Sequence, residues 1–270
     1  MLRPIVGLLT DFGLRDSYVA QMKLVIASRS DCEIMDLSHE IPRQDVVAAG
    51  LFVREVRSTL YRAGHDREFY FITVIDPGVG TERRILVARK GKETILAPDN
   101  GILPIAFVEP PDFVRSIDRA DLFLPSESRT FHGRDRFAPV AAALVNGVHP
   151  AKVGAELAWE ALARVGWKDP VYETRQARGS VVSTDHFGNI VTDLDASRLD
   201  SMSPYELLIG DRMISMIHAS YADAGRSEEP FLIVGSRNTL EISVNRGSAA
   251  ELLQPERFEE VVIRPMKRES

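Results

Sequence analysis

Hydrophobic and polar positions follow two different periodicities over the first 160 or so residues. Two continuous apolar runs are typical of strands buried on both faces of a parallel sheet, residues 5–9 and 68–75. Apolar side chains at helical spacing predict helices over residues 19–26, 44–60 and 139–145. Residues 85–89 and 94–97 flank Lys90-Gly91-Lys92, which predicts a hairpin. This order of elements predicts an α/β domain built on a mainly parallel sheet flanked by helices.

From about residue 171 the pattern changes to short strands separated by closely spaced turn residues. We expect these strands at residues 181–183, 190–192, 205–209, 231–234, 240–244 and 259–263. A small barrel or sandwich is the usual outcome of such a pattern. The sequence therefore predicts two domains, an α/β domain over residues 1–170 and an all-β, barrel-like domain over residues 171–270.

Composition narrows the possible partners. The chain has 270 residues, of which 44% are hydrophobic, and 33 Lys+Arg stand against 39 Asp+Glu for a net charge of −6. Because no basic excess exists to neutralise phosphates, we expect no nucleic-acid partner. No apolar run approaches the ~18 residues of a membrane span, and the apolar N-terminal stretch is too short for a signal peptide. Cys32 is the single cysteine, which excludes an intramolecular disulfide, and we expect a cytoplasmic protein.

Two of the predicted strands are followed by an aspartate, Asp11 after the first and Asp76 after residues 68–75. Ligands of α/β proteins bind outside the carboxyl ends of parallel strands, so both carboxylates are candidate site residues. Capping of a loop or of the following helix is the alternative for each. Together with Asp99, His132 and Asp135 they could form an oxygen-rich metal site, but no metal-ligand spacing accompanies them, and we expect no metal.

Seven segments stand out in order along the chain: LLTDFGLRDSYVAQMK, DLSHEIPRQDVVAAGLFV, FITVIDPGVGTERR, LAPDNGIL, TFHGRDRFAPVAAAL, DHFGNIVTDL and VGSRNTLEISVNRGSAAELL. Together they resemble the S-adenosyl-L-methionine (SAM) hydroxide adenosyltransferase family, the adenosine-forming SAM hydrolases. That family is related to enzymes that fluorinate or chlorinate the same molecule. The resemblance extends from residue 5 to about residue 254, nearly the whole chain.

The resemblance implies a metal-independent enzyme that splits SAM at the ribose 5′ carbon with water, giving adenosine and L-methionine. SAM would then be the substrate and no cofactor is implied. The implied catalytic residues are Asp76, Arg83 and His132. Halogenating relatives carry a non-acidic residue at the position of Asp76 and a serine at that of Gly133, so we expect water as the nucleophile. A SAM-dependent halogenase and a non-catalytic protein that binds adenosine or SAM are the alternatives.

The resemblance also implies eight substrate-binding residues: Asp11, Asp16, Asp185, Asn189, Ser236, Arg237, Asn245 and Arg246. A carboxylate such as Asp11 suits a ribose diol, further carboxylates suit the ammonium of the methionine moiety, and an Arg fork suits its carboxylate. Asn189 has the donor and the acceptor that an adenine edge needs. Without the resemblance, Asp16 would be interpreted as a helix cap and Asn189 as a turn residue. In the family the two domains contribute these residues from different subunits of a homotrimer, so a homotrimer is implied here.

The residue types suit the chemistry. Attack at the 5′ carbon of a sulfonium releases neutral methionine, which needs no general acid. The difficulty lies in the nucleophile, because hydroxide is scarce near pH 7. A permanent cation such as Arg83 beside a bound water favours its deprotonation. Either His132 or Asp76 could take the proton, and the sequence leaves this choice open.

Overall fold

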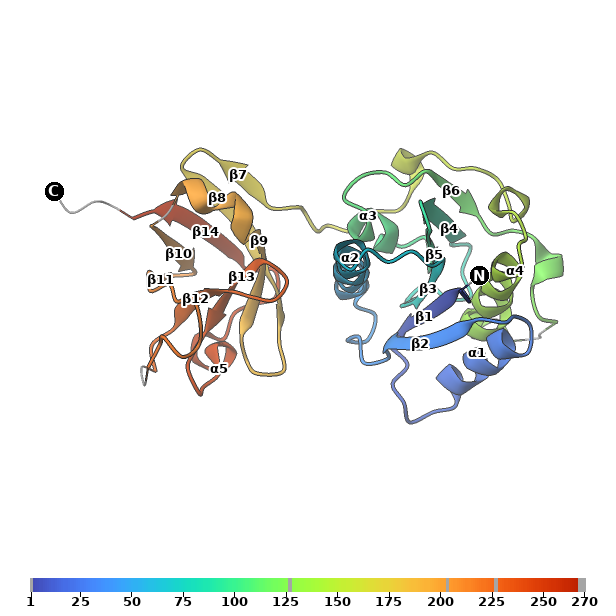
Figure 1. Ribbon diagram of the computed structural model, residues 1–270, viewed down its shortest axis with the longest axis horizontal. Helices are drawn as coiled ribbons and strands as arrows, with labels where there is room; N and C mark the ends of the chain where they lie inside the picture. The colour runs from blue at the N-terminus through green and yellow to red at the C-terminus, as the bar shows by residue number, and fades with distance from the viewer. Residues whose placement is uncertain (1, 126–127, 203, 226–227, 267–270) are drawn as a thin grey trace. The chain divides into compact units, whose positions relative to one another are not determined.

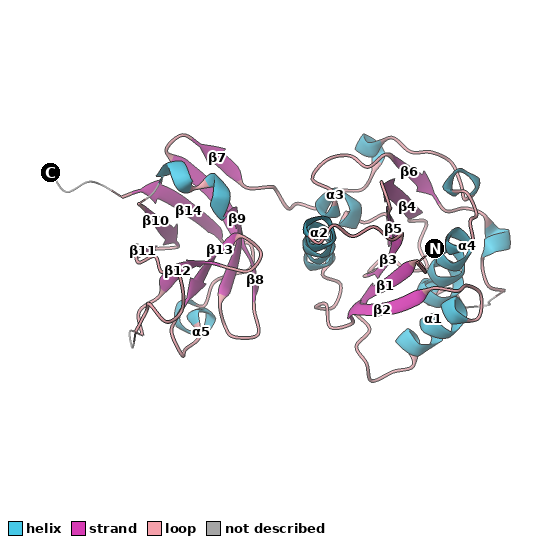
Figure 2. Cartoon of the chain, viewed as in Figure 1, coloured by secondary structure: helices cyan, strands magenta, loops and turns pink. Residues whose placement is uncertain are grey.

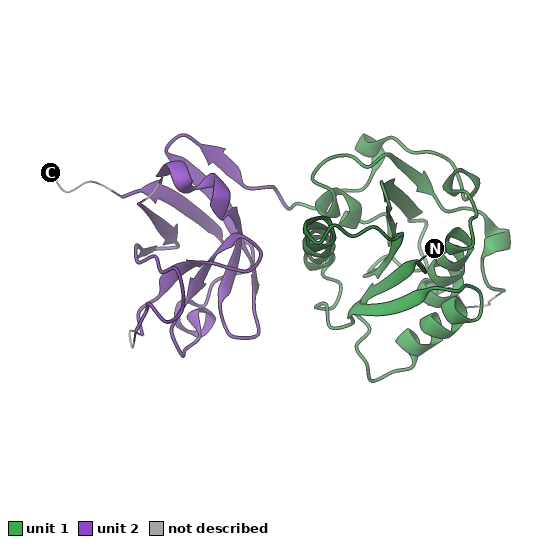
Figure 3. Cartoon of the chain, in the orientation of Figure 1, with its two compact units in different colours: residues 1–166 green, residues 167–270 purple. Residues whose placement is uncertain are grey.

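The computed structural model describes residues 2–125, 128–202, 204–225 and 228–266. The chain divides into two compact units, which meet in sequence between Gly166 and Trp167 (Figure 3). Unit 1 is an α/β structure, whereas the regular structure of unit 2 is mostly β-strand (Figure 2).

Unit 1 is built on a six-stranded sheet in the order β2-β1-β3-β5-β4-β6. The strands are β1 Ile5–Thr10, β2 Glu33–Ser38, β3 Phe69–Val74, β4 Ile85–Lys90, β5 Glu93–Pro98 and β6 Phe113–Ser116. The first four neighbours run parallel, whereas β4 is antiparallel to both β5 and β6. The sheet is therefore mainly parallel, as predicted, but mixed rather than purely parallel, because β4 runs against its neighbours. The physical reason is the predicted β4–β5 hairpin, which is confirmed: a two-residue loop joins only antiparallel strands.

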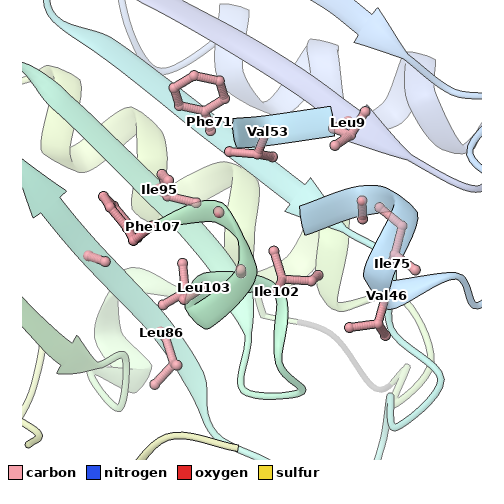
Figure 4. Close-up of a cluster of buried hydrophobic side chains, with 14 of the residues drawn as sticks. Leu9, Val46, Val53, Phe71, Ile75, Leu86, Ile95, Ile102, Leu103 and Phe107 are labelled. Carbon is pink, nitrogen blue, oxygen red and sulfur yellow. The ribbon is translucent and has the colours of Figure 1, made fainter. Parts of the chain in front are cut away.

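Helices cover both faces of this sheet (Figure 1). Helices α1 Tyr18–Ala27 and α4 Ala138–Val145 pack on one face. Helices α2 Val46–Arg62 and α3 Ile102–Ala106 pack on the other, where Figure 4 shows Val53 and Ile102 among the buried side chains around Phe71 and Ile95. Because β3 is buried along its whole length between these layers, its run of apolar residues has no polar face.

Unit 2 is an antiparallel sheet in the order β11-β10-β14-β8-β9-β13-β12, with β7 paired to β8. Its elements are β7 Val171–Glu173, β8 Gln176–Thr184, β9 Ile190–Asp195, β10 Tyr205–Ile209, β11 Arg212–Ile214, β12 Phe231–Val234, β13 Thr239–Ser243, α5 Ala249–Leu253 and β14 Glu260–Pro265. The segment after β11 returns to β12, where His218 N donates to Leu232 O at 2.9 Å and Leu232 N donates to Met216 O at 2.7 Å. The sheet is thereby nearly closed, as the predicted barrel-like domain requires.

Candidate active site

Asp76 and Arg83 form a buried ion pair at the carboxyl end of β3. Arg83 lies in the loop that leads to β4, and its Nε donates to Asp76 Oδ1 at 2.7 Å while Nη2 donates to Oδ2. The side chains are 5% and 8% exposed, respectively. A bidentate pair fixes the plane of the guanidinium as well as its position.

His132 completes this cluster from a different element. It immediately precedes a π-helix, Gly133–Phe137, which continues into α4. Single π-helical turns inside helices are frequent at functional sites. His132 Nδ1 lies 2.8 Å from Arg83 Nη2, and because a guanidinium only donates, Nδ1 accepts and the ring proton of the neutral imidazole lies on Nε2. The structure thus brings together the three residues that the family resemblance assigns to catalysis.

The environment of His132 keeps its ring neutral. Burial lowers the pKa of His132 to about 4, assisted by the positive charges of Arg136 and Arg83 and opposed by Asp76 and Asp135. His132 is 3% exposed, so solvent screens these charges little. Burial also lowers the pKa of the Arg136 guanidinium, together with repulsion from Arg83.

One donor of the cluster is left over. Arg83 Nη1 is buried, and no hydrogen-bond partner for it is found among the described residues.

Gly133, the residue after His132, adjoins the Met22 sulfur and the rings of Phe131 and Phe12; a Cβ built on Gly133 would lie 3.0 Å from Met22 Sδ. A larger residue at Gly133 would therefore displace its neighbours.

Two predicted binding residues lie in the loop between β1 and α1. Asp11 is half-buried, and its Oδ2 accepts a hydrogen bond of 2.8 Å from the backbone N–H of Gln44. Asp16 is exposed. Since Ser17 is the N-cap residue of α1, the alternative interpretation of Asp16 as the cap is wrong.

In unit 2, Asp185 organises the turn between β8 and β9. Its Oδ1 accepts from the backbone N–H groups of Phe187 at 2.8 Å and Asn189 at 2.9 Å, and its Oδ2 accepts from Asn189 Nδ2 at 2.8 Å. Asn189 Nδ2 also lies 3.1 Å from the Tyr221 hydroxyl. Asn189 is buried and is oriented by both partners, so its amide presents one fixed edge.

Ser236 and Arg237 occupy the exposed tip of the β12–β13 hairpin. The turn closes through Asn238 N to Gly235 O at 3.0 Å and Gly235 N to Thr239 O at 2.9 Å, and Asn238 has a left-handed φ of 59°. This is the usual geometry of a three-residue hairpin loop with a bulge.

A cavity of about 670 Å³ connects these features of unit 2. Its lining includes four predicted residues, Asp185, Asn189, Ser236 and Arg246, and four residues not singled out from the sequence, Phe187, Tyr221, Gly235 and Glu241. Arg237 and Asn245 do not line it, and the Asn245 amide donates to the carbonyl of Gly225. The sequence does carry one signal for Glu241, because it is a charged residue between Leu240 and Ile242 in a buried strand.

Gly235 and Glu241 depend on each other. The Glu241 carboxylate packs directly against the α-carbon of Gly235, at the place a Cβ would occupy. Any other residue at position 235 would displace this carboxylate, so glycine is required here for space.

Other parts of the molecule are less suited to the predicted chemistry. A second cavity, of about 980 Å³, lies in unit 1 beside Arg67, Lys90 and Lys92, at the end of the sheet away from Asp76. None of the predicted site residues lines it. Asp99, one of the metal candidates, holds Arg84 and accepts from Ala163 N at 2.9 Å. Within the described ranges, no three His, Cys, Asp or Glu side chains gather as metal ligands would, and no helix is long and apolar enough to cross a bilayer.

The fold and site together define an α/β unit with a buried Asp–Arg–His cluster, followed in the chain by a barrel-like unit that carries a cavity of its own. Comparison with known proteins identifies the family. The SAM hydroxide adenosyltransferase N-terminal domain matches residues 6–154, and the corresponding C-terminal domain matches residues 179–262. The chain belongs to the SAM hydroxide adenosyltransferase family.

Individual relatives agree with this membership. A Thermus thermophilus protein named (R)-S-adenosyl-L-methionine hydrolase is 36% identical over 265 residues, covering 93% of this chain and 96% of that one. A crystal structure of an uncharacterized conserved protein from Thermotoga maritima superposes with a TM-score of 0.83 at 31% identity, covering 96% of this chain and 99% of that one. A protein of Nocardia brasiliensis named fluorinase is 25% identical over 290 residues and 92% of either chain.

Proposed function

We propose that this protein hydrolyses SAM at the ribose 5′ carbon, giving adenosine and L-methionine without a metal ion. Family membership and the hydrolase name of the Thermus thermophilus relative support the substrate and reaction. The observation that carries the mechanism is the Arg83 guanidinium, whose Nε and Nη2 are occupied by Asp76 and His132 while the buried Nη1 is left to bind a further group.

In this mechanism a water molecule binds to Arg83 Nη1. A buried guanidinium stabilises hydroxide more than water, because opposite charges attract strongly where solvent screening is weak. Hydroxide then attacks the 5′ carbon: the new C5′–O bond forms, the C5′–S bond breaks, and its electron pair stays on sulfur as the neutral thioether of methionine. The proton lost by the water passes to solvent, so SAM cation and water give adenosine, methionine and one proton.

In this proposal neither Asp76 nor His132 accepts the proton of the water. His132 Nδ1 already accepts from Arg83, and a group with a pKa of about 4 is a weak base at neutral pH. Both oxygens of Asp76 accept from Arg83 as well. We therefore assign both residues to holding the guanidinium, and hydroxide forms by ionisation of the bound water.

Substrate recognition divides between the units. Asp11 at the end of β1 would accept from the ribose diol, and Asp16 is the unit 1 carboxylate assigned to the ammonium. In unit 2, Asn189 would bind adenine, with Asn245 and Arg246 beside it. Arg237 and Ser236 would bind the methionine carboxylate and Asp185 the ammonium, although the hydrogen bonds within its turn already occupy much of Asp185.

The decisive experiment compares two adjacent arginines. Arg84 forms an ion pair with Asp99 much as Arg83 does with Asp76, but it lies outside the cluster, so Arg84→Met is the matched control for Arg83→Met. With SAM in chelator-treated buffer, the wild type should release adenosine and methionine in a 1:1 ratio, and Arg84→Met should do so at a similar rate. Arg83→Met should be slower by about 100-fold, the usual effect of removing one preorganised hydrogen-bond donor from an active site. Absence of adenosine from the wild type would refute the hydrolase, and equal rates of both variants would refute the role of Arg83.

A halogenase is the second candidate, because relatives named fluorinase match most of the chain. In the same assay with high chloride it would yield 5′-chloro-5′-deoxyadenosine. We expect adenosine, because position 133 is glycine and Met22, Phe131 and Phe12 crowd its α-carbon.

We also propose that the active protein is a homotrimer, as the family resemblance implies, with each site drawn from two subunits. Light scattering tests the oligomeric state. Mixing Arg83→Met with Arg237→Ala after joint refolding should restore part of the activity that each variant lacks, because some sites then combine two intact contributions. No recovery in a mixed trimer would contradict sites shared between subunits.

A further inference from the structure

His39 is buried beside the loop that carries Asp11, and none of the roles above includes it. It immediately follows β2, in the segment DLSHEIP, and is 4% exposed. Its Nδ1 lies 2.8 Å from Thr10 Oγ1, and its Nε2 lies 2.9 Å from Asp36 Oδ1. Asp36 Oδ2 in turn accepts from Lys23 of α1 at 2.6 Å.

Thr10, His39 and Asp36 are hydrogen-bonded in the same order as the hydroxyl, imidazole and carboxylate of a catalytic triad, but they do not act as one. Thr10 is the last residue of β1 and is completely buried, so no substrate atom reaches its hydroxyl. A hydroxyl, an imidazole and a carboxylate in series can also act as a chain of directed hydrogen bonds that holds the backbone. The surroundings favour this second role.

The direction of each hydrogen bond follows from the partners. Burial works to raise the pKa of Asp36, but hydrogen bonds from His39 and Lys23 outweigh it and leave that pKa below its usual value. Asp36 is therefore an ionised acceptor and His39 donates through Nε2. Nδ1 is then the acceptor for the Thr10 hydroxyl, and the Thr10 oxygen accepts from the backbone N–H of Phe12 at 3.3 Å.

The hydrogen bonds of His39 involve residues on both sides of Asp11, Thr10 before it and Phe12 and Gly13 after it. Through Thr10 the His39 side chain holds the N–H of Phe12, and the His39 carbonyl accepts from the N–H of Gly13 at 2.8 Å. Position 39 thus fixes the backbone that follows Asp11, while Gln44 N–H fixes one oxygen of its carboxylate. A shift of the loop would move the whole Asp11 carboxylate, including the oxygen that Gln44 does not hold.

We propose that His39 is a positioning residue that holds the Asp11 carboxylate in place for the two ribose hydroxyls. The inference rests on the proposed function, in which Asp11 binds the ribose. It assigns to His39, with Asp36 and Thr10, the selectivity of this protein for a ribonucleoside over a 2′-deoxyribonucleoside.

The test measures affinities for adenosine and 2′-deoxyadenosine by calorimetry on the full chain, and compares their ratio. Wild type should prefer adenosine by about tenfold or more, the usual size of one hydrogen bond to a charged group. His39→Leu and Asp11→Asn should each remove most of this preference, and the double variant should lose no more than either alone. Non-additivity is the signature of residues that act through one another. A folded His39→Leu protein with the wild-type preference would overturn the proposal.

Conservative variants separate positioning from a general loss of packing. Asparagine places an acceptor near Nδ1 and can keep the bond to Thr10, whereas glutamine reaches toward Asp36 instead, so His39→Asn should retain more of the preference than His39→Gln. If His39→Leu fails to fold, Thr10→Val against Thr10→Ser makes the same comparison at the next bond. Equal preference ratios within either pair would contradict the chain of bonds.

The outcomes also separate this inference from the proposed function. A wild type that binds adenosine selectively but does not cleave SAM refutes the hydrolase, and the His39 variants still decide the positioning role. A wild type that binds both nucleosides equally, or neither, overturns the inference at once.

Discussion

His132 should remain neutral until the pH falls to about 4. The ring is buried, the charges of Arg136 and Arg83 oppose its protonation, and Nδ1 accepts from Arg83. Relative to the ordinary pKa of 6.5, a value of about 4 corresponds to about 3 kcal/mol of preference for the neutral ring in the folded protein. The unfolded chain binds this proton more readily, so the contribution to stability is complete above pH 6.5 and is lost as the pH falls from 6.5 to about 4.

Nitrogen-15 NMR of labelled histidine measures this directly. The chain has six histidines, and a His132→Gln sample identifies the signal of residue 132. We expect a midpoint near 4 and, at neutral pH, the Nε2–H tautomer. Arg136→Gln removes one of the opposing charges and should raise the midpoint, whereas Arg136→Lys keeps the charge and should change it little.

The same experiment can refute the reasoning. A midpoint near 6.5, or an Nδ1–H tautomer at neutral pH, would mean that Arg83 does not donate to His132. The assignment of hydroxide formation to the bound water would then fail. A profile of kcat/KM without an inflection near pH 6.5, rising toward alkaline pH, is the matching kinetic expectation.

Three further substitutions test the site. Asp76→Asn keeps the shape of the side chain but leaves the Arg83 charge buried and unpaired, so urea unfolding should show a loss of about 3 kcal/mol and adenosine release should fall sharply. Gly235→Ala places a methyl group where the Glu241 carboxylate packs, so calorimetry should show weaker adenosine binding with an unchanged melting temperature for unit 1. Gly133→Ser should leave adenosine as the product in high chloride by chromatography, because Met22, Phe131 and Phe12 crowd the position that the serine side chain would take; a chlorinated product would contradict this.

Apolar patterning alone was sufficient for most of the architecture. The buried strand β3, the β4–β5 hairpin and the strands of the barrel follow from local features, namely continuous apolar runs and the glycine-containing turns between them. The same patterning predicted that Asp11 and Asp76 follow two buried strands, β1 and β3, which are neighbours in the sheet. Edge strands were less visible: β2 is half exposed, so it lacks the apolar run that identifies a buried strand.

Tertiary structure alone decided how the site residues meet. Arg83 and His132 are 49 positions apart, and Thr10 and His39 are 29 apart, so no local pattern connects them. The tautomer of His132, the left-over donor of Arg83 and the packing of Glu241 on Gly235 depend on distances of a few ångströms between separate elements. The sequence determines which groups are present and which elements carry them, but hydrogen-bond direction and burial arise only when the folded chain brings those elements together.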